Sequence, residues 1–280
     1  MSRRFCTSVP FEGPGRLAIV VTGALLGASL MFGPANAADR DRYRQEGVTL
    51  RLVALPPEAD GTIRGALSIE LEPGWKTYWI APGPVGLAPQ LDTSGSTDVR
   101  KVRFAYPVPS RFREGEAESI GYLQTVELPI TAEASGPRPL LRLRAFLGVC
   151  RELCVPVQAE LMADPNPGLS DRAMVMRAGA VVPDEAGPLR ASGARWNADG
   201  SALLVDLASP IEGPPPEGFV SAGDGWSFGA PSPAEGGPAE TLVFPALSRP
   251  TGGAHPVSAD ILLTQNERAQ LSRAVPIAPR

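Results

Sequence analysis

The stretch Leu141-Arg-Leu-Arg-Ala-Phe-Leu-Gly-Val-Cys150-Arg-Glu-Leu-Cys154-Val-Pro-Val-Gln-Ala-Glu-Leu161 decides how this chain is expected to fold. Apolar residues recur at every second position on both sides of the cysteines, which is the period of a half-buried β-strand. They are Leu141, Leu143, Ala145, Leu147 and Val149 on the first side, and Val155, Val157, Ala159 and Leu161 on the second. The pattern predicts two strands joined by a tight hairpin-like turn at Arg151-Glu152-Leu153.

The predicted hairpin places Cys150 and Cys154 across from each other at its mouth. Directly opposed antiparallel residues have Cα atoms about 4.5 to 5.5 Å apart, a separation that a disulfide tolerates. Closing so short a loop removes only about 2 kcal/mol of unfolded-chain entropy, so the bond adds little to a chain that has its own core. Spacing alone leaves three alternatives, which are redox exchange, a structural clip and a metal site. Exchange is favoured because it needs two vicinal cysteines, of which at least one is reachable.

The alternative of a metal site depends on sulfur ligands from cysteine and methionine. Two thiolates can hold copper(I), and Met162, Met174 and Met176 lie downstream, although methionines at helical spacing are more often core residues. A zinc site usually has four ligands, and the single histidine of the chain, His255, is far from the cysteines in the sequence. The prediction is therefore no metal and no cofactor.

Composition favours all-β modules. The 280 residues permit one or two domains, and 30 glycines and 31 prolines leave little uninterrupted chain for long helices. Apolar residues at 43% and charged residues at 20% are globular values. A formal charge of −4 argues against a nucleic-acid binder, and one histidine argues against histidine-based catalysis.

Short apolar runs bounded by proline and glycine predict a β-sandwich that carries the cysteines, at 48–55, 62–71, 99–105, 125–131, 140–149 and 155–162. The aromatic, proline-rich segment 75–89 is predicted as an ordered loop, and 170–180 as a helix with Ser170 at its N-cap. Further strands are predicted at 202–208, 218–222, 241–247 and 257–264. The expected organisation is a redox domain at 38–165, a linker with a short helix at 166–189, and a second, smaller β-sandwich-like domain at 190–280.

Residues 1–37 have the pattern of a secretory signal peptide. Arg3 and Arg4 precede the apolar run Leu17–Phe32, and Ala35-Asn36-Ala37 offers a small-residue cleavage site. The run is shorter than the roughly 20 residues of a spanning helix. Cleavage would remove Cys6, so Cys150 and Cys154 would be the only cysteines of an exported chain without a transmembrane segment.

Four blocks in the same order make the chain resemble the amino-terminal periplasmic domain of the thiol:disulfide interchange protein DsbD family, in the branch of the suppressor of copper sensitivity protein ScsB. The blocks are Pro73-Gly-Trp-Lys-Thr-Tyr-Trp-Ile-Ala-Pro-Gly-Pro-Val-Gly-Leu-Ala-Pro89, Tyr106-Pro-Val-Pro-Ser-Arg-Phe112, Ile120-Gly-Tyr122 with Leu128-Pro129, and Cys150-Arg-Glu-Leu-Cys-Val-Pro156. The resemblance covers roughly residues 47–165. The three-residue gap between the cysteines departs from the wider spacing of the enteric DsbD domain and is similar to the copper-sensitivity branch.

The resemblance implies an immunoglobulin-like sandwich whose cysteine pair takes electrons from a membrane partner and passes them to thioredoxin-like periplasmic proteins. It implies that Cys154 is the nucleophile and Cys150 the resolving thiol. Tyr78, Trp79, Tyr122 and Pro156 are the candidates for a cap or pocket over the pair, with core packing as the alternative for the aromatic residues. Because no membrane channel is seen in this sequence, the electron donor is expected in trans. The competing hypothesis is a non-catalytic module that handles copper(I) or docks a redox partner.

Overall fold

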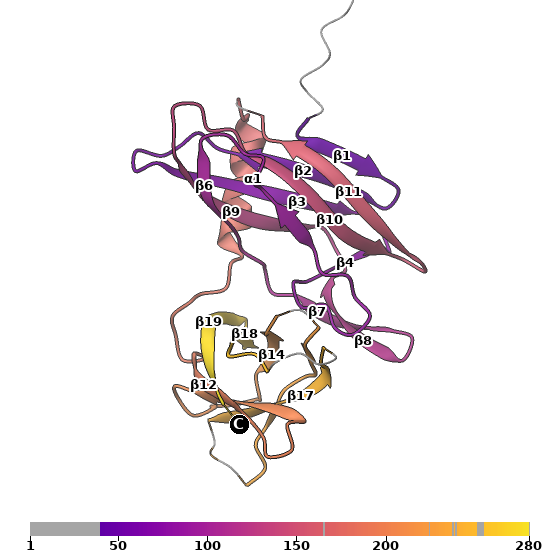
Figure 1. Ribbon diagram of the computed structural model, residues 1–280, viewed down its shortest axis with the longest axis vertical. Helices are drawn as coiled ribbons and strands as arrows, with labels where there is room; N and C mark the ends of the chain where they lie inside the picture. The colour runs from indigo at the N-terminus through magenta and orange to yellow at the C-terminus, as the bar shows by residue number, and fades with distance from the viewer. Residues whose placement is uncertain are drawn as a thin grey trace, which may run out of the picture. The chain divides into compact units, whose positions relative to one another are not determined.

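The computed structural model describes residues 40–279 except 165, 224, 237, 239 and 251–254, and the predicted signal peptide lies outside this range. The described chain is built from β-strands and one helix (Figure 1). The strands up to the helix are β1 (Arg42–Gln45), β2 (Val48–Ala54), β3 (Thr62–Leu71), β4 (Lys76–Tyr78), β5 (Gln90–Asp92), β6 (Val99–Phe104), β7 (Ser110–Glu114), β8 (Ala117–Tyr122), β9 (Val126–Ala134), β10 (Arg142–Cys150) and β11 (Cys154–Met162). The helix is α1 (Leu169–Ala180).

Two antiparallel sheets form the amino-terminal sandwich. One has the strand order β1-β2-β3-β9-β6, and the other has the order β11-β10-β4-β8-β7 with β5 also pairing with β10. Alternate side chains of both sheets enter one hydrophobic core, for example Leu50 and Leu128 from the first sheet and Leu143 and Val157 from the second. The predicted inward faces of β10 and β11 are confirmed, since residues at every second position are buried while Arg142 and Arg144 are exposed.

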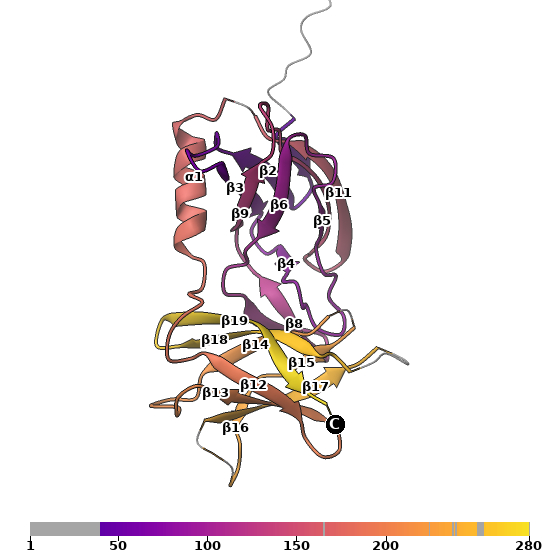
Figure 2. The same cartoon turned by 60° about the vertical axis from the view of Figure 1, so that its left-hand side comes forward.

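The helix α1 packs against β2 and β3 on the face that is turned away from this core (Figure 2). Met174, Val175 and Ala178 contact Val53 and Ala66 there, so β3 is buried on both faces. The predicted N-cap is wrong, because the helix begins at Leu169 with Gly168 before it. The backbone N–H of Gly168 donates to the Asp171 carboxylate at 2.8 Å, which stabilises the first turn in place of a hydroxyl cap.

The carboxy-terminal strands form a second all-β unit with its own core. They are β12 (Ala191–Trp196), β13 (Ala202–Leu207), β14 (Glu217–Ser221), β15 (Ser227–Phe228), β16 (Ser232–Pro233), β17 (Thr241–Ser248), β18 (Ser258–Gln265) and β19 (Arg268–Ala278). Their order is β14-β18-β19-β12-β13-β17-β15, with β16 beside β17. The predicted fold class, two β-sandwich-like units with a short helix between them, is confirmed.

Two local predictions need correction. The segment 75–89 is not entirely loop, because Lys76–Tyr78 form β4, which pairs with β10 on one side and β8 on the other. The strands β1, β5, β7, β8, β12, β15, β16 and β19 were not predicted either. Four of them are short, and charged residues, glycine or proline interrupt the apolar runs of β7, β8, β12 and β19. In the part of the chain that the structure describes, no helix has the length and apolar character needed to cross a membrane.

Candidate redox site

The predicted hairpin forms, and its two cysteines are joined. Cys150 is the last residue of β10 and Cys154 the first of β11, and they are partners in a continuous antiparallel register that runs back to Arg142 and Met162. Their Cα atoms are 4.1 Å apart and their sulfurs form a disulfide. The short turn between them exposes Arg151, Glu152 and Leu153 to solvent.

The two halves of this disulfide differ sharply in exposure. Cys150 is 1% exposed, because its strand β10 is paired with β11 on one side and with Lys76 of β4 on the other. Cys154 is exposed at the start of an edge strand. An incoming thiolate must approach a sulfur in line with the bond that it breaks. The arrangement therefore offers Cys154 for attack and leaves Cys150 as the buried leaving group.

The hydroxyl of Tyr78 lies against both sulfurs, 3.1 Å from Cys150 Sγ and 3.3 Å from Cys154 Sγ. Glycine makes room for its ring, since a Cβ at Gly148 would come within 3.2 Å of Tyr78 Cε2. Burial, and then the negative charge of Glu114, raise the pKa of Tyr78 above its ordinary value. The phenol is therefore protonated at neutral pH and can donate one hydrogen bond.

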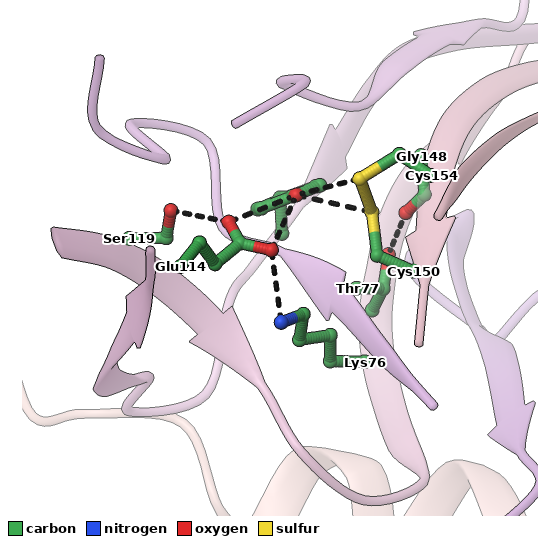
Figure 3. Close-up of a disulfide and its surroundings, with 8 residues drawn as sticks. Lys76, Thr77, Glu114, Ser119, Gly148, Cys150 and Cys154 are labelled. Carbon is green, nitrogen blue, oxygen red and sulfur yellow. Dashed lines mark hydrogen bonds and ion pairs between the residues drawn. A yellow bond between two sulfur atoms is a disulfide. The ribbon is translucent and has the colours of Figure 1, made fainter. Parts of the chain in front are cut away.

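Glu114 receives that hydrogen bond and is held by two further groups (Figure 3). Its carboxylate accepts a 2.5 Å hydrogen bond from Ser119 and lies 2.9 Å from the ammonium of Lys76. Burial raises the pKa of Glu114, but the hydrogen bonds from Ser119, Lys76 and Tyr78 outweigh it, so the pKa is lower than usual. A carboxylate and an ammonium, paired with each other, thus stand beside the disulfide at neutral pH.

Sequence reasoning did not find Lys76, Glu114 and Ser119. They come from β4, β7 and β8, and the contact from Tyr78 to Glu114 spans 36 positions of the chain. The one local signal was Glu114-Gly115 in a charged segment, where Gly115 has a positive φ of 61° that suits a hairpin turn. A turn there folds β7 onto β8 and brings the carboxylate to β4.

The other cap candidates have different surroundings. Trp79 is 2% exposed, and its ring packs edge-on against Phe219 at 5.9 Å. Tyr122 is buried and donates a 2.9 Å hydrogen bond to the carbonyl of Pro107. Pro156 is exposed on β11, opposite Gly148. Of the four candidates, the structure brings Tyr78 into hydrogen-bonding distance of the sulfurs.

One cluster beside the disulfide has the spacing of a metal site. One ligand atom each from Glu114, Cys150 and Cys154 lie within 4.8 Å of one another. Both sulfurs are bonded to each other here, and only free thiolates are good metal ligands. Any metal binding would therefore belong to the reduced form.

Comparisons with known proteins match the segment that carries the cysteine pair to a protein family. Residues 51–165 match the family described as thiol:disulfide interchange protein DsbD, N-terminal. The crystal structure of the amino-terminal periplasmic domain of ScsB from Proteus mirabilis aligns with a TM-score of 0.64 and 21% identity, over 83% of this chain and 96% of that one. The reduced amino-terminal domain of DsbD from Neisseria meningitidis aligns with a TM-score of 0.28 and 14% identity, over 43% of this chain and 87% of that one. No curated protein sequence matches.

The family match ends at residue 165, directly after the hairpin that carries the disulfide. Thiol-disulfide redox relay is the activity of this family, and a cysteine pair at disulfide distance is present inside the matched range. Residues 51–165 therefore form a DsbD amino-terminal-like domain, and the chain shares the fold of the ScsB amino-terminal domain.

Proposed function

We propose that this chain exchanges disulfides with thioredoxin-like proteins of the periplasm, and that it relays electrons to them from a membrane reductase. The observation that carries the proposal is the asymmetric disulfide, with Cys154 exposed, Cys150 buried and the Tyr78 hydroxyl beside both sulfurs. An exposed sulfur with a shielded partner restricts attack to one of the two atoms. Both half-reactions then pass through Cys154.

In the loading step, a thiolate of the donor attacks Cys154 Sγ and forms a mixed disulfide, while the bond to Cys150 breaks. Cys150 leaves with the bonding electron pair and takes up a proton. The second thiol of the donor then attacks the donor sulfur that is bonded to Cys154. This forms a disulfide within the donor and releases Cys154 as a thiol. The donor has lost two electrons and two protons and holds a disulfide, and this chain has gained them as two thiols.

In the unloading step the roles are reversed. Cys154 attacks the disulfide of a thioredoxin-like acceptor, and Cys150 then attacks Cys154 Sγ in the mixed disulfide. This closes the Cys150–Cys154 bond and releases the acceptor as a dithiol. Cys154 is thus the nucleophile and Cys150 the resolving thiol. In the disulfide form the Tyr78 hydroxyl donates to Glu114. When Cys150 leaves as a thiolate, the same hydroxyl, 3.1 Å from Cys150 Sγ, can turn its one hydrogen bond to that sulfur and stabilise it.

Trapping with Cys150→Ala tests the proposal. This variant keeps the exposed thiol but cannot resolve a mixed disulfide, so a covalent complex between Cys154 and a thioredoxin-like protein should accumulate in periplasmic extracts. Cys154→Ala is the matched control, because its remaining thiol is buried, and it should trap nothing. Equal trapping by both variants, or by neither, would count against exchange through Cys154.

Residues 1–37 are part of the same proposal, as the signal that directs export. Amino-terminal sequencing of protein recovered from the periplasmic fraction should begin at Ala38. Recovery of the chain from the cytoplasmic fraction with Met1 retained would refute this compartment.

A second candidate function is binding of copper(I) by the reduced pair. The clustering of Glu114, Cys150 and Cys154 favours it, although a carboxylate is a hard ligand and copper(I) prefers sulfur. Titration of the reduced protein with copper(I) against a competing thiol separates the two candidates. Tight binding without any trapped partner supports the copper module, whereas trapping with weak binding supports exchange.

A further inference from the structure

We infer that the carboxy-terminal sheet positions the groups beside the disulfide, and that Arg111 is the residue through which it does so. The inference rests on the proposed exchange at Cys150 and Cys154. The family match ends at residue 165, so it assigns no role to β14 or to its neighbours. Contacts of Arg111 and of Phe219 connect that sheet to the site.

The two faces of the β7–β8 hairpin contact different parts of the molecule. Successive side chains of a strand point to opposite faces. Phe112 and Glu114 of β7 face the site, since the Phe112 ring lies 6.3 Å from that of Tyr78 and 5.1 Å from the Lys76 ammonium, and Glu114 accepts from Tyr78. Arg111, next to Phe112 on the opposite face, points to the carboxy-terminal strands.

Arg111 joins β7 to the two end strands of the carboxy-terminal sheet. Its side chain is 9% exposed, and the guanidinium donates from Nη2 to the carbonyls of Gly218, at 2.6 Å, and Gly229, at 3.2 Å. From Nη1 it donates to Glu118 of β8 at 2.6 Å and to the carbonyl of Phe228 at 3.4 Å. End strands leave carbonyls that lack a ladder partner, and a planar fork of five N–H donors suits several at once.

A second contact reaches the other side of the site. The centroid of the Phe219 ring of β14 lies 5.0 Å from the Arg111 guanidinium, and the ring also packs against Trp79. Trp79 directly follows Tyr78, whose ring points the opposite way, to the sulfurs. Gly218–Phe219 of β14 therefore contacts Arg111, on the strand that carries Glu114, and Trp79, which directly follows Tyr78 at the end of β4.

The test compares the rates at which a cationic thiol, cysteamine, and an anionic thiol, 2-mercaptoethanesulfonate, reduce the disulfide. In the parent protein the Glu114 carboxylate offsets the positive charge of the Lys76 ammonium beside the disulfide, so the anionic reagent gains no advantage there. If Arg111 holds the hairpin, Arg111→Gln lets Glu114 move away, and the ratio of the cationic to the anionic rate falls by roughly threefold or more. Simple loss of the arginine charge would do the reverse and raise this ratio.

Arg113→Gln is the matched control, because Arg113 lies on the same strand and the same face, but its side chain is 75% exposed. It should leave the ratio close to that of the parent protein. Hydrogen exchange of the β7–β8 amides should speed up at least about tenfold in Arg111→Gln and stay unchanged in Arg113→Gln. Glu114→Gln should lower the ratio by itself, and adding Arg111→Gln to it should lower the ratio no further.

If Arg111→Gln does not fold, Arg111→Lys replaces it in the test. This variant keeps the positive charge but loses the planar set of N–H donors, and it should also lower the ratio. A ratio that rises or stays unchanged in the folded Arg111 variants, with unaltered amide exchange, would overturn the inference. Because only small thiols are used, this result is independent of the trapping experiment. Absence of a trapped partner would refute the proposed function and leave the positioning role of Arg111 standing.

Discussion

Two hairpins of this chain are closed in different ways. β18 and β19 are joined by Asn266 and Glu267, which both have a positive φ, of 49° and 64°, and no covalent link. β10 and β11 are joined by a three-residue turn with a disulfide across its mouth. Both hairpins place alternate residues in a buried core. Backbone pairing and core burial suffice to hold the β18–β19 hairpin together. By this comparison the β10–β11 hairpin does not need its disulfide for closure, so the bond is available for thiol-disulfide exchange.

The largest effect on stability should come from the buried faces of both hairpins. Leu147 of β10 and Leu263 of β18 are 1% and 0% exposed. Leu147→Ala and Leu263→Ala should each lower the free energy of unfolding by about 2 to 5 kcal/mol, measured by urea unfolding of the oxidised protein. Leu153→Ala, in the exposed turn, is the control and should change it little. A near-zero cost for Leu147→Ala alone would mean that the disulfide holds the β10–β11 hairpin.

Reduction of the disulfide should have the next largest effect. Opening a loop of this length costs about 2 kcal/mol or less of unfolding free energy, because little chain entropy is regained. Urea unfolding with and without dithiothreitol measures the difference. The double variant Cys150→Ser/Cys154→Ser controls for effects of the reductant. A loss above about 4 kcal/mol would make the bond a structural clip and remove the contrast with β18–β19.

Tyr78→Phe should slow reduction of the disulfide by a small thiol about tenfold, because the buried Cys150 thiolate loses its hydrogen-bond donor. Phenylalanine keeps the ring that packs beside Gly148. Stopped-flow kinetics with glutathione at fixed pH give the rate constant. Tyr43→Phe removes a hydroxyl from the distant strand β1, where it donates to Gln45, and should leave the rate unaltered. An equal rate for Tyr78→Phe would exclude the hydroxyl from the step.

The smallest effect should be a dependence of stability on pH. The pKa of Glu114 is lowered by folding, so its contribution is complete above the ordinary value of 4.5 and is lost as the pH falls through the lower, folded value. Thermal midpoints between about pH 5 and about pH 3 should fall less steeply in Glu114→Gln than in the parent protein. Glu116→Gln, at a fully exposed position of the same hairpin, should keep the parent slope. An unchanged slope in Glu114→Gln would mean that folding does not lower the pKa of this carboxyl group.

The sequence allowed the β10–β11 hairpin to be predicted because both of its signals are local. Alternation of apolar residues defines a strand that is buried on one face, and a gap of three residues brings the cysteines into register. β7 and β8 gave no such signal. Arg111, Arg113, Glu116 and Glu118 interrupt their apolar pattern, and this hairpin is held by ion pairs and by contacts with distant strands.

The residues of the site also differ in whether the sequence could predict them. Cys150, Cys154 and Tyr78 stand in blocks that could be recognised from the sequence, and the structure brings them together. Glu114 and Lys76 could not be assigned, because their contacts depend on β4 pairing with β8 and on the turn at Gly115. The positions of the signal peptide cleavage and of the domain boundaries stay predictions.

The place of Cys150 within its sheet decides which atoms move when the bond opens. Its strand is hydrogen-bonded on both sides, and the Thr77 hydroxyl fixes the nearby carbonyl of Gly148 at 2.9 Å. Cys154 lies at the end of an edge strand, after three solvent-exposed residues. The oxidised and reduced forms should therefore share one stationary sulfur. A docked protein would distinguish them by the location of the other sulfur and of the short turn before it.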